Sequence, residues 1–273
     1  MIKYLQECDA QTLEDVPFCV IGSGAAGITV AVELARAGKR VLLLEAGDWK
    51  DDATLDDAYA GEVTPPHPEA TEYRRQRFGG TTHLWGGRCV PLDKQDMDIR
   101  PHVPHSGWPI THEELSKYYP LAMDYCDAGQ ADFELTALGS SPVPMFGELP
   151  DLYPEIIERL ERYSLPTDFA RKFQTEITQS KTLTVLLRAR CTALNTNKEG
   201  SDIESITLSN GVDQWQVRAQ QFILCGGGLE TTRLLLMARQ QSAAWHRFDA
   251  SLGRYYTCHF DVIFGDLRFK GHL

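Results

Sequence analysis

The stretch Phe18–Gly47 constrains the fold of this chain more than any other part of its sequence. It begins with an apolar run, Phe18–Ile21, of the length expected for one buried parallel strand. The residues Gly22–Gly27 (GSGAAG) then form a G-x-G-x-x-G turn into a helical pattern, and a second apolar run, Val41–Leu44, ends in Glu45. Strand, glycine turn, helix and second strand, in this order, predict a complete βαβ unit with an acid at its end.

The residue types in this unit have chemical reasons to bind a dinucleotide. Gly22 permits the tight turn, Gly24 lets a pyrophosphate approach bare backbone, and Gly27 lets the helix pack closely against the strand. Free N–H groups at the start of the helix would hold the phosphate charge. Glu45 can accept hydrogen bonds from both hydroxyls of an adenosine ribose, and its charge would repel a 2′-phosphate. We therefore predict a dinucleotide site; the alternative is a glycine turn that closes the strand for purely structural reasons.

The composition excludes several classes of partner. The chain of 273 residues has a formal net charge of -11, so we expect no nucleic-acid partner and no basic patch for anionic lipid. No window approaches about 18 consecutive apolar residues, so no membrane span is expected. The segment Met1–Val16 is polar and acidic without an apolar signal core, which favours a cytoplasmic protein. The seven cysteines include no CxxC pair, so we predict no metal site and no disulfide framework.

A second glycine-rich stretch, Arg77–Cys89, follows after the regular α/β pattern has ended. The intervening Asp48–Glu72 is acidic, and its prolines predict an exposed loop without helix, whereas a plain nicotinamide-binding domain would continue with further βα repeats. In the later stretch two glycine pairs bracket hydroxyls, a histidine and a tryptophan, so its backbone could lie against a flat ligand. The alternative is a glycine-rich surface loop, which would have little use for Phe78 and Trp85.

The remainder of the chain predicts a largely helical insertion followed by a β-rich segment. Residues 1–16 predict only a leader with at most one helical turn. The expected helices of the insertion are one from the capping box at Thr111 to about Asp127, one over about Pro154–Tyr163 and one turn within Pro166–Phe173. The runs that predict an antiparallel meander are Leu183–Leu187, Cys191–Asn195, Ile203–Leu208 and Gln214–Arg218. A buried strand, Gln221–Cys225, then leads through three glycines into a helix from Leu229, which makes a second strand–glycine–helix junction.

Taken together, these segments resemble the glucose–methanol–choline family of FAD-dependent oxidoreductases. The resemblance rests on motifs in matching order and spacing: GSGAAG at 22–27, VLLLEAG at 41–47, GGTTHLWGG at 79–87 and FILCGGGLETTRLLL at 222–236. A looser match is LGRYYTCH at 252–259. GGTTHLWGG is the most specific of them, because NAD-binding proteins do not generally share it.

The resemblance implies FAD as the cofactor and assigns residues to it. The pyrophosphate and adenosine ribose would lie at Gly22, Gly24, Ala25, Ala26, Gly27, Glu45 and Ala46, the adenine at the backbone of Cys191 and the ribityl region near Gly226. The isoalloxazine side would lie along Gly80, Thr81, His83, Trp85, Gly86 and Gly87. Some relatives, the pyranose oxidases, attach FAD covalently through a histidine in a similar T-H-W segment. Because Leu84 separates His83 from Trp85, we expect ordinary packing or a hydrogen bond near the flavin instead.

The expected architecture is α/β. It combines a Rossmann-like FAD-binding domain, built on a parallel sheet with an antiparallel β-meander, and an inserted cap of helices and loops. The predicted parts are residues 1–99 and 181–245 for the FAD-binding domain, 100–180 for the cap and 246–273 for the start of a truncated substrate domain.

The resemblance further implies oxidation of a CH–OH group of an alcohol or sugar, with hydride passing to flavin N5 while a base removes the hydroxyl proton. Family members are much longer and carry a catalytic histidine near the C-terminus. None of the eight histidines of this chain matches that position, so no catalytic residue is assigned. We expect an incomplete enzyme whose C-terminal half a second polypeptide could supply; the alternative is a non-catalytic FAD-binding fragment or subunit. A disulfide reductase would need a second G-x-G-x-x-G unit and a CxxxxC pair, and the sequence has neither.

Overall fold

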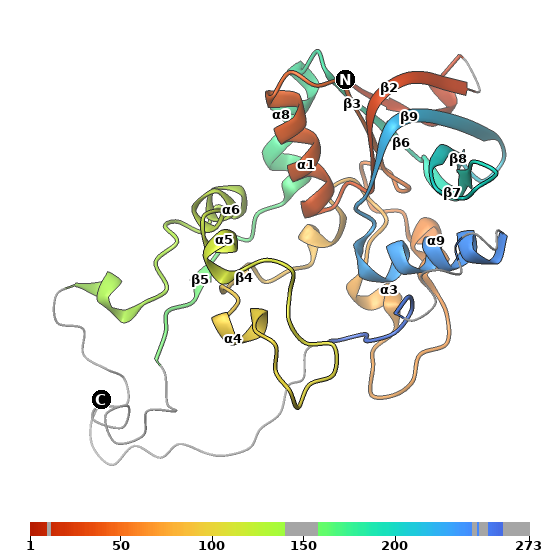
Figure 1. The fold of residues 1–273 in the computed structure, drawn as a ribbon. Coiled ribbons are helices and arrows are strands. Elements are labelled where there is room, and N and C mark those ends of the chain that lie inside the picture. Colours follow the sequence, from red (N-terminus) through yellow and green to blue (C-terminus); the bar gives the residue numbers. More distant parts are fainter. Residues whose placement is uncertain (10–11, 140–157, 242–244, 246–250, 259–273) are drawn as a thin grey trace.

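The computed structural model describes residues 1–9, 12–139, 158–241, 245 and 251–258. The predicted helix over Pro154–Tyr163 therefore lies partly outside the described residues, and most of the predicted segment 246–273 does too. Figure 1 shows a central sheet with helices on both faces, and a more open portion around α4 (Lys94–Met97), α5 (His112–Ser116) and α6 (Tyr119–Cys126) to one side of it.

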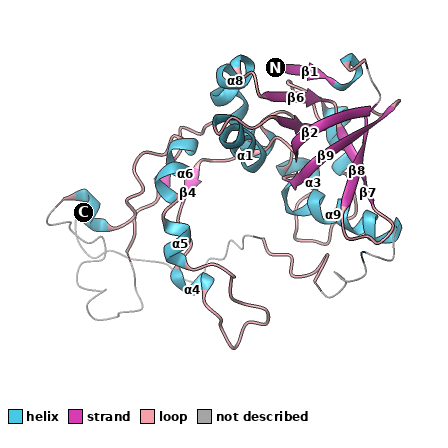
Figure 2. Ribbon diagram, turned by 45° about the horizontal axis from the view of Figure 1, so that its top comes forward, coloured by secondary structure: helices cyan, strands magenta, loops and turns pink. Residues whose placement is uncertain are grey.

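One seven-stranded sheet forms the centre, with the strand order β1-β6-β3-β2-β9-β8-β7. Its strands are β1 (Ile2–Tyr4), β2 (Thr12–Ile21), β3 (Val41–Leu44), β6 (Leu183–Leu187), β7 (Arg190–Thr196), β8 (Ile203–Ser209) and β9 (Gln214–Leu224). The neighbouring strands β1, β6, β3, β2 and β9 pair in parallel. At the other side of the sheet, β8 pairs antiparallel with both β9 and β7 (Figure 2). The predicted α/β class, with a parallel sheet and an antiparallel meander, is confirmed.

The βαβ unit predicted from the sequence is present as β2, α1 (Ala25–Arg36) and β3. Phe18 pairs with Val41 and Ile21 with Leu44 in parallel register. The helix buries Ile28, Ala31 and Val32 against the sheet, as the 3.6-residue spacing of these side chains predicts.

Two apolar layers cover the two faces of the sheet. Alternate residues of β2 point to opposite sides, so Val20 packs with α1 and α8 (Phe169–Gln179), while Cys19 and Ile21 pack with α9 (Gly227–Gln241) and the meander. Figure 1 shows α1 and α8 next to each other on the first face and α9 on the second. The carboxyl ends of the parallel strands are therefore bordered by the N-terminus of α1 and the start of α9.

The N-terminal segment contains more regular structure than the sequence predicts. Ile2–Tyr4 forms β1 and pairs in parallel with β6, and Leu5–Glu7 forms one 3-10 turn, η1. The strand expected to begin at Phe18 begins at Thr12 and pairs with β9 over most of its length. Met1 adds a further contact between the edge strand β1 and its neighbour β6, because its amino group donates to the Leu183 carbonyl oxygen (2.7 Å). Whether these segments form strands depends on their pairing with distant strands, and a local sequence pattern carries no information about that pairing.

The β-rich segment departs from the predicted meander in two respects. Leu183–Leu187 has the predicted bounds but joins the parallel part of the sheet, between β1 and β3. The two strands predicted at Gln214–Arg218 and Gln221–Cys225 form one continuous strand, β9, which pairs with β8 at its start and with β2 along its length. The remaining meander, β7-β8-β9, is as predicted.

The helices of the insertion also differ from the expectation. The helix predicted from Thr111 to about Asp127 is divided into α5 and α6, because Pro120 has no N–H for the helical bond to residue 116. Residues 158–161 are not helical, and Arg162–Tyr163 forms β5, which pairs with β4 (Arg88–Cys89). The turn expected within Pro166–Phe173 is the beginning of α8, which packs against α1, although the division of the chain into domains stays a prediction.

Short helical turns occupy loops that were expected to be irregular. The predicted loop Asp48–Glu72 contains α2 (Ala53–Asp56), the 3-10 turn η2 (Asp57–Tyr59) and the start of α3 (Ala70–Tyr73). Its prolines lie between these turns and so do not interrupt them. The other 3-10 turns are η3 (Gly80–His83) and η4 (Leu135–Leu138). Over the described part of the chain, every helix is too short or too polar to cross a membrane.

Candidate functional site

The first glycine turn lies at the carboxyl end of β2 and is closely packed on its inner side. Gly22 has a left-handed φ of 100°, and its N–H donates to the Leu44 carbonyl oxygen (2.9 Å). A Cβ on Gly22 would lie 2.6 Å from the Cys225 oxygen, and one on Gly27 would lie 1.8 Å from the Gly22 oxygen. No side chain other than hydrogen fits at either position.

The outer side of the same turn is open. A Cβ on Gly24 would meet nothing within 4 Å, and Ala25 and Ala26 are exposed. Gly24 is the N-cap of α1 and offers no side-chain cap, so the first N–H groups of this twelve-residue helix have no partner from a capping side chain. Unpaired N–H groups and the helix dipole together favour a bound anion. The turn thus fits a diphosphate, as the sequence predicts for these residues.

Glu45 supports the turn from behind. Its buried carboxylate accepts hydrogen bonds from the hydroxyl of Ser23, from the Ser23 N–H (3.2 Å) and from the Gly47 N–H (2.8 Å). Burial raises the pKa of Glu45, while these hydrogen bonds lower it, and the net shift is upward. The predicted contact of Glu45 with a ribose stays a prediction; its neighbour Ala46 is half-buried.

The second glycine-rich stretch reaches the turn by running along the end of β3. A Cβ on Gly47 would lie 1.8 Å from the Gln76 oxygen, and the Phe78 N–H donates to the Asp48 carbonyl oxygen (2.9 Å). Phe78 is completely buried and stacks on Trp49, with 5.1 Å between the ring centroids. The stretch is therefore not a solvated surface loop.

Gly79 and Gly80 bring this stretch into contact with the first turn. The Gly79 N–H donates to the Ser23 carbonyl oxygen (3.1 Å), and a Cβ on Gly80 would lie 2.9 Å from the Gly24 Cα. Both glycines have positive φ values, 92° and 55°. Two segments of bare backbone, which begin 57 residues apart in the sequence, thus meet at the carboxyl ends of the parallel strands.

The other residues predicted to line the flavin are distributed around this junction. Thr81 and Gly86 are exposed, whereas Gly87 is buried against Ser164, whose N–H donates to the Gly87 carbonyl oxygen (2.7 Å). Trp85 is half-buried, and its indole N–H donates to the Thr167 carbonyl oxygen (3.1 Å). His83 contacts protein atoms through both ring nitrogens. Their contacts with a flavin stay predictions.

The second strand–glycine–helix junction lies directly against the first turn. The Cys225 N–H donates to the Ile21 carbonyl oxygen (2.7 Å), and Gly226 follows at the start of α9. Cys191, the predicted adenine contact, lies on β7 under α9. Burial raises the pKa of the Cys191 thiol to about 12, and the predicted contact of its backbone with adenine stays a prediction.

Three residues that the sequence reasoning missed form a cluster, of which Tyr59 lies close enough to Glu45 for the charge of Glu45 to affect it. The Arg74 guanidinium lies 3.7 Å from the centroid of the Tyr59 ring and 3.1 Å from a carboxylate oxygen of Glu230. Burial raises the pKa of Tyr59, and the nearby charge of Glu45 raises it further. No spacing rule links these three positions, because they come from η2, the end of α3 and the first turn of α9.

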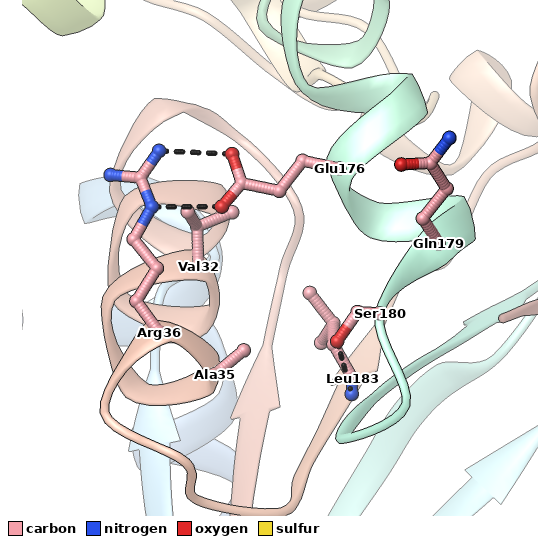
Figure 3. A pocket seen from close by; sticks show the side chains of 7 residues that line it. All are labelled: Val32, Ala35, Arg36, Glu176, Gln179, Ser180 and Leu183. Carbon is pink, nitrogen blue, oxygen red and sulfur yellow. Dashed lines mark hydrogen bonds and ion pairs between the residues drawn. The ribbon is translucent and has the colours of Figure 1, made fainter.

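Two cavities lie near the amino ends of the parallel strands, away from the glycine turn. One of about 250 Å³, between the C-terminal ends of α1 and α8, is lined by Val32, Ala35, Arg36, Glu176, Gln179, Ser180 and Leu183 (Figure 3). The other, of about 380 Å³, borders the amino ends of β3 and β6. Ligands of open α/β sheets bind at the carboxyl ends of the strands, so neither cavity belongs to the glycine junction.

Comparisons with known proteins agree with this geometry. The family model "FAD dependent oxidoreductase" (DAO) matches residues 18–246. Pyridoxine 4-oxidase from Mesorbium loti has a similar structure, with a TM-score of 0.53 at 20% identity over 82% of this chain and 52% of that chain. A fungal aryl-alcohol oxidase gives a TM-score of 0.53 at 16% identity over 82% and 48% of the two chains. These two structures show a shared fold.

A curated protein is similar in sequence over a shorter stretch. The 2-methyl-1,2-propanediol dehydrogenase of Mycolicibacterium austroafricanum is 29% identical over 37% of this chain and 22% of that protein. The chain spans about half the length of the two solved structures and less than a quarter of the curated relative. The resemblance predicted from the sequence is confirmed for the FAD-dependent family and for the fold. Because the family model extends from β2 to just beyond α9, this chain belongs to the FAD dependent oxidoreductases.

Proposed function

We propose that this chain binds FAD where its two glycine-rich segments meet and takes part in oxidising a CH–OH group of an alcohol or sugar. The observation that carries this proposal is the contact of Gly79 and Gly80 with Ser23 and Gly24. This contact joins an anion-binding helix start to a second run of bare backbone. An elongated dinucleotide with a diphosphate in its middle matches that arrangement.

Each part of the junction has its own task. The N–H groups at the start of α1 orient the diphosphate, and Glu45 keeps the turn in shape by accepting hydrogen bonds from Ser23 and Gly47. The Gly79–Gly87 segment provides a wall that extends from the diphosphate toward the flavin end. When bound, FAD supplies the acceptor for the hydride that leaves the substrate carbon.

The alcohol substrate is supported by the names of the similar proteins. One is a dehydrogenase of a diol, and another is an aryl-alcohol oxidase. The sugar alternative is supported by the family that the motifs resemble. A cytoplasmic location is part of the proposal, and it is supported by the seven free cysteines, which are typical of proteins in a reducing compartment.

Anaerobic reduction of the bound flavin tests the activity. The chain is loaded with FAD, separated from free flavin and mixed without oxygen with an aliphatic diol, an aryl alcohol or a sugar. Bleaching of the visible flavin band by any of them, with the matching aldehyde or ketone formed, is the expected result. A chain that stays yellow with all three while binding FAD tightly contradicts the proposed oxidation.

A second candidate function is FAD binding without independent turnover. Among the histidines in the described part of the chain, His83 lies in the second glycine-rich stretch, and both of its ring nitrogens contact protein atoms. Two others also contact protein groups: His67 pairs with Tyr256 and His105 with Tyr255. His83, His67 and His105 are thus not placed as free bases. In this case a second polypeptide would supply the base, and adding it would restore bleaching.

A further inference from the structure

His83 is enclosed by protein at the end of η3. Its side chain is 12% exposed, and its Nε2 lies 3.0 Å from the Phe78 carbonyl oxygen. A carbonyl oxygen can only accept, so Nε2 carries a proton and donates it. The other nitrogen, Nδ1, lies 3.1 Å from a carboxylate oxygen of Asp168. Both ring nitrogens are therefore engaged with acceptors from the protein itself.

Asp168 belongs to the element on which this segment rests. It is the N-cap of α8, and its second oxygen accepts from the Arg171 N–H (3.2 Å). Two further bonds join the same elements: the Phe169 N–H donates to the Thr82 hydroxyl oxygen (3.3 Å), and Trp85 donates to the Thr167 carbonyl oxygen (3.1 Å). The segment Gly79–Gly87 is thus attached to the start of α8 at several points.

This attachment determines where the bare backbone lies. Gly79 is pressed against α8, since an added Cβ would lie 2.9 Å from the Ala170 Cβ, and Gly80 is pressed against Gly24 on its other side. A shift of η3 away from α8 would change the gap between the two glycine-rich segments. The contact of His83 with Asp168 has a carboxylate as one partner, and hydrogen bonds that involve a charged group are stronger than neutral ones.

Resting on the proposed function, we propose that His83 and Asp168 form a clamp that positions Gly79–Gly87 as the flavin-side wall, and that FAD is held there without a covalent bond to His83. His83 is then a positioning residue for the segment. A bond from either ring nitrogen to the flavin would remove its contact with Phe78 or Asp168, so the clamp and a covalent linkage exclude each other.

Acid precipitation of the FAD-loaded chain tests the absence of the bond. The expected result is a colourless pellet with all the flavin in the supernatant. Flavin that stays with the denatured protein and survives on the tryptic peptide containing His83 overturns the inference. Wild-type protein that retains no FAD before precipitation contradicts the proposed function, which is a different failure.

Separate titrations with FAD and ADP test the clamp, because ADP carries the diphosphate and lacks the flavin. In His83→Ala and in Asp168→Asn we expect FAD affinity to fall about tenfold and ADP affinity to stay within about twofold. Asparagine can still cap α8, so Asp168→Asn removes the carboxylate that faces His83 and keeps the helix start. His112→Ala is the matched control, since His112 lies on α5 and contacts Ser116.

The ratio of the two affinities separates a local role from general destabilisation. A variant that is merely less stable loses FAD and ADP binding together, and this result overturns the clamp. Equal affinities in wild type and both variants overturn it as well. If His83→Ala does not fold, Asp168→Asn alone decides. Iodide quenching of the bound flavin gives an independent signal, and we expect it to increase in both clamp variants and to stay unchanged in His112→Ala.

Discussion

The two glycine-rich segments of the site are held in place by different kinds of contact. The turn Gly22–Gly27 is fixed mostly by neighbours within one βαβ unit: Glu45 supports it, and Leu44 accepts from Gly22, while Cys225 packs against Gly22 from outside the unit. The segment Gly79–Gly87 is fixed by distant elements, above all by α8. A compact motif can thus carry most of its own support, whereas an extended segment depends on packing that is built elsewhere in the chain.

Gly27→Ala should have the largest effect, because it breaks the first segment from within. The added Cβ would lie 1.8 Å from the Gly22 carbonyl oxygen, and backbone cannot move away from it. We expect a loss of about 3 kcal/mol or more in the free energy of unfolding, measured by urea denaturation. Gly24→Ala is the control: its Cβ meets nothing within 4 Å, so the loss should be about 1 kcal/mol or less. Equal losses in the two variants contradict the packing described for the turn.

Gly80→Ala should be the next in size, since it acts where the two segments touch. The substitution places a Cβ 2.9 Å from the Gly24 Cα and imposes a φ of 55° on a residue with a side chain. About 2 kcal/mol of stability should be lost through strain and overpacking. In Gly86→Ala the new Cβ meets nothing within 4 Å, so its thermal midpoint should remain near that of the wild type. A Gly80→Ala protein as stable as wild type would show that the contact between the segments is absent.

Glu45→Gln should have a smaller effect that depends on pH. Burial raises the folded-state pKa of Glu45 above its ordinary value of 4.5, so the folded protein binds a proton more tightly than the unfolded chain. The stability due to this group is fully present below that ordinary value and is lost as pH rises through the folded pKa. The advantage of wild type over Glu45→Gln should therefore increase on going from pH 7.5 to 4.5. Urea denaturation of both proteins at several pH values measures it, and an advantage that decreases toward acid would mean that folding lowers the pKa of Glu45.

Breaking the ion pair between α1 and α8 should have the smallest effect. Arg36 donates to both carboxylate oxygens of Glu176 (2.8 and 2.9 Å), but both side chains are more than 40% exposed (Figure 3). Because solvent screens such a pair, its coupling free energy should be only about 0.5 kcal/mol. A double-mutant cycle with Arg36→Ala and Glu176→Ala would measure it. FAD affinity should not change, because the pair lies near the amino ends of the parallel strands, away from the glycine turn. A coupling above about 2 kcal/mol would mean that this pair, and not apolar packing, joins the two helices.

The same contrast explains what the sequence could and could not predict. Phe18–Gly47 is a local pattern with one geometric solution, so its strands, its helix and the roles of Gly22 and Gly27 were predictable. The pairing of Ile2–Tyr4 with Leu183–Leu187 joins segments far apart in the chain, and no local pattern contains it. For the second segment, the burial of Phe78 could be anticipated from its apolar character. The support from Asp168 could not, because nothing in the sequence relates residue 168 to residue 83.

Calorimetric titration of FAD into the wild type and into Gly24→Val tests the central claim most directly. The valine side chain would occupy the open side of the turn, where a diphosphate should lie, and its Cβ meets no protein atom within 4 Å. We predict that wild type binds FAD and that Gly24→Val binds it at least about tenfold more weakly, with a circular dichroism spectrum close to that of wild type and a loss of stability no greater than about 1 kcal/mol. Equal FAD affinity in two equally folded proteins would contradict the claim that the cofactor is held at this junction.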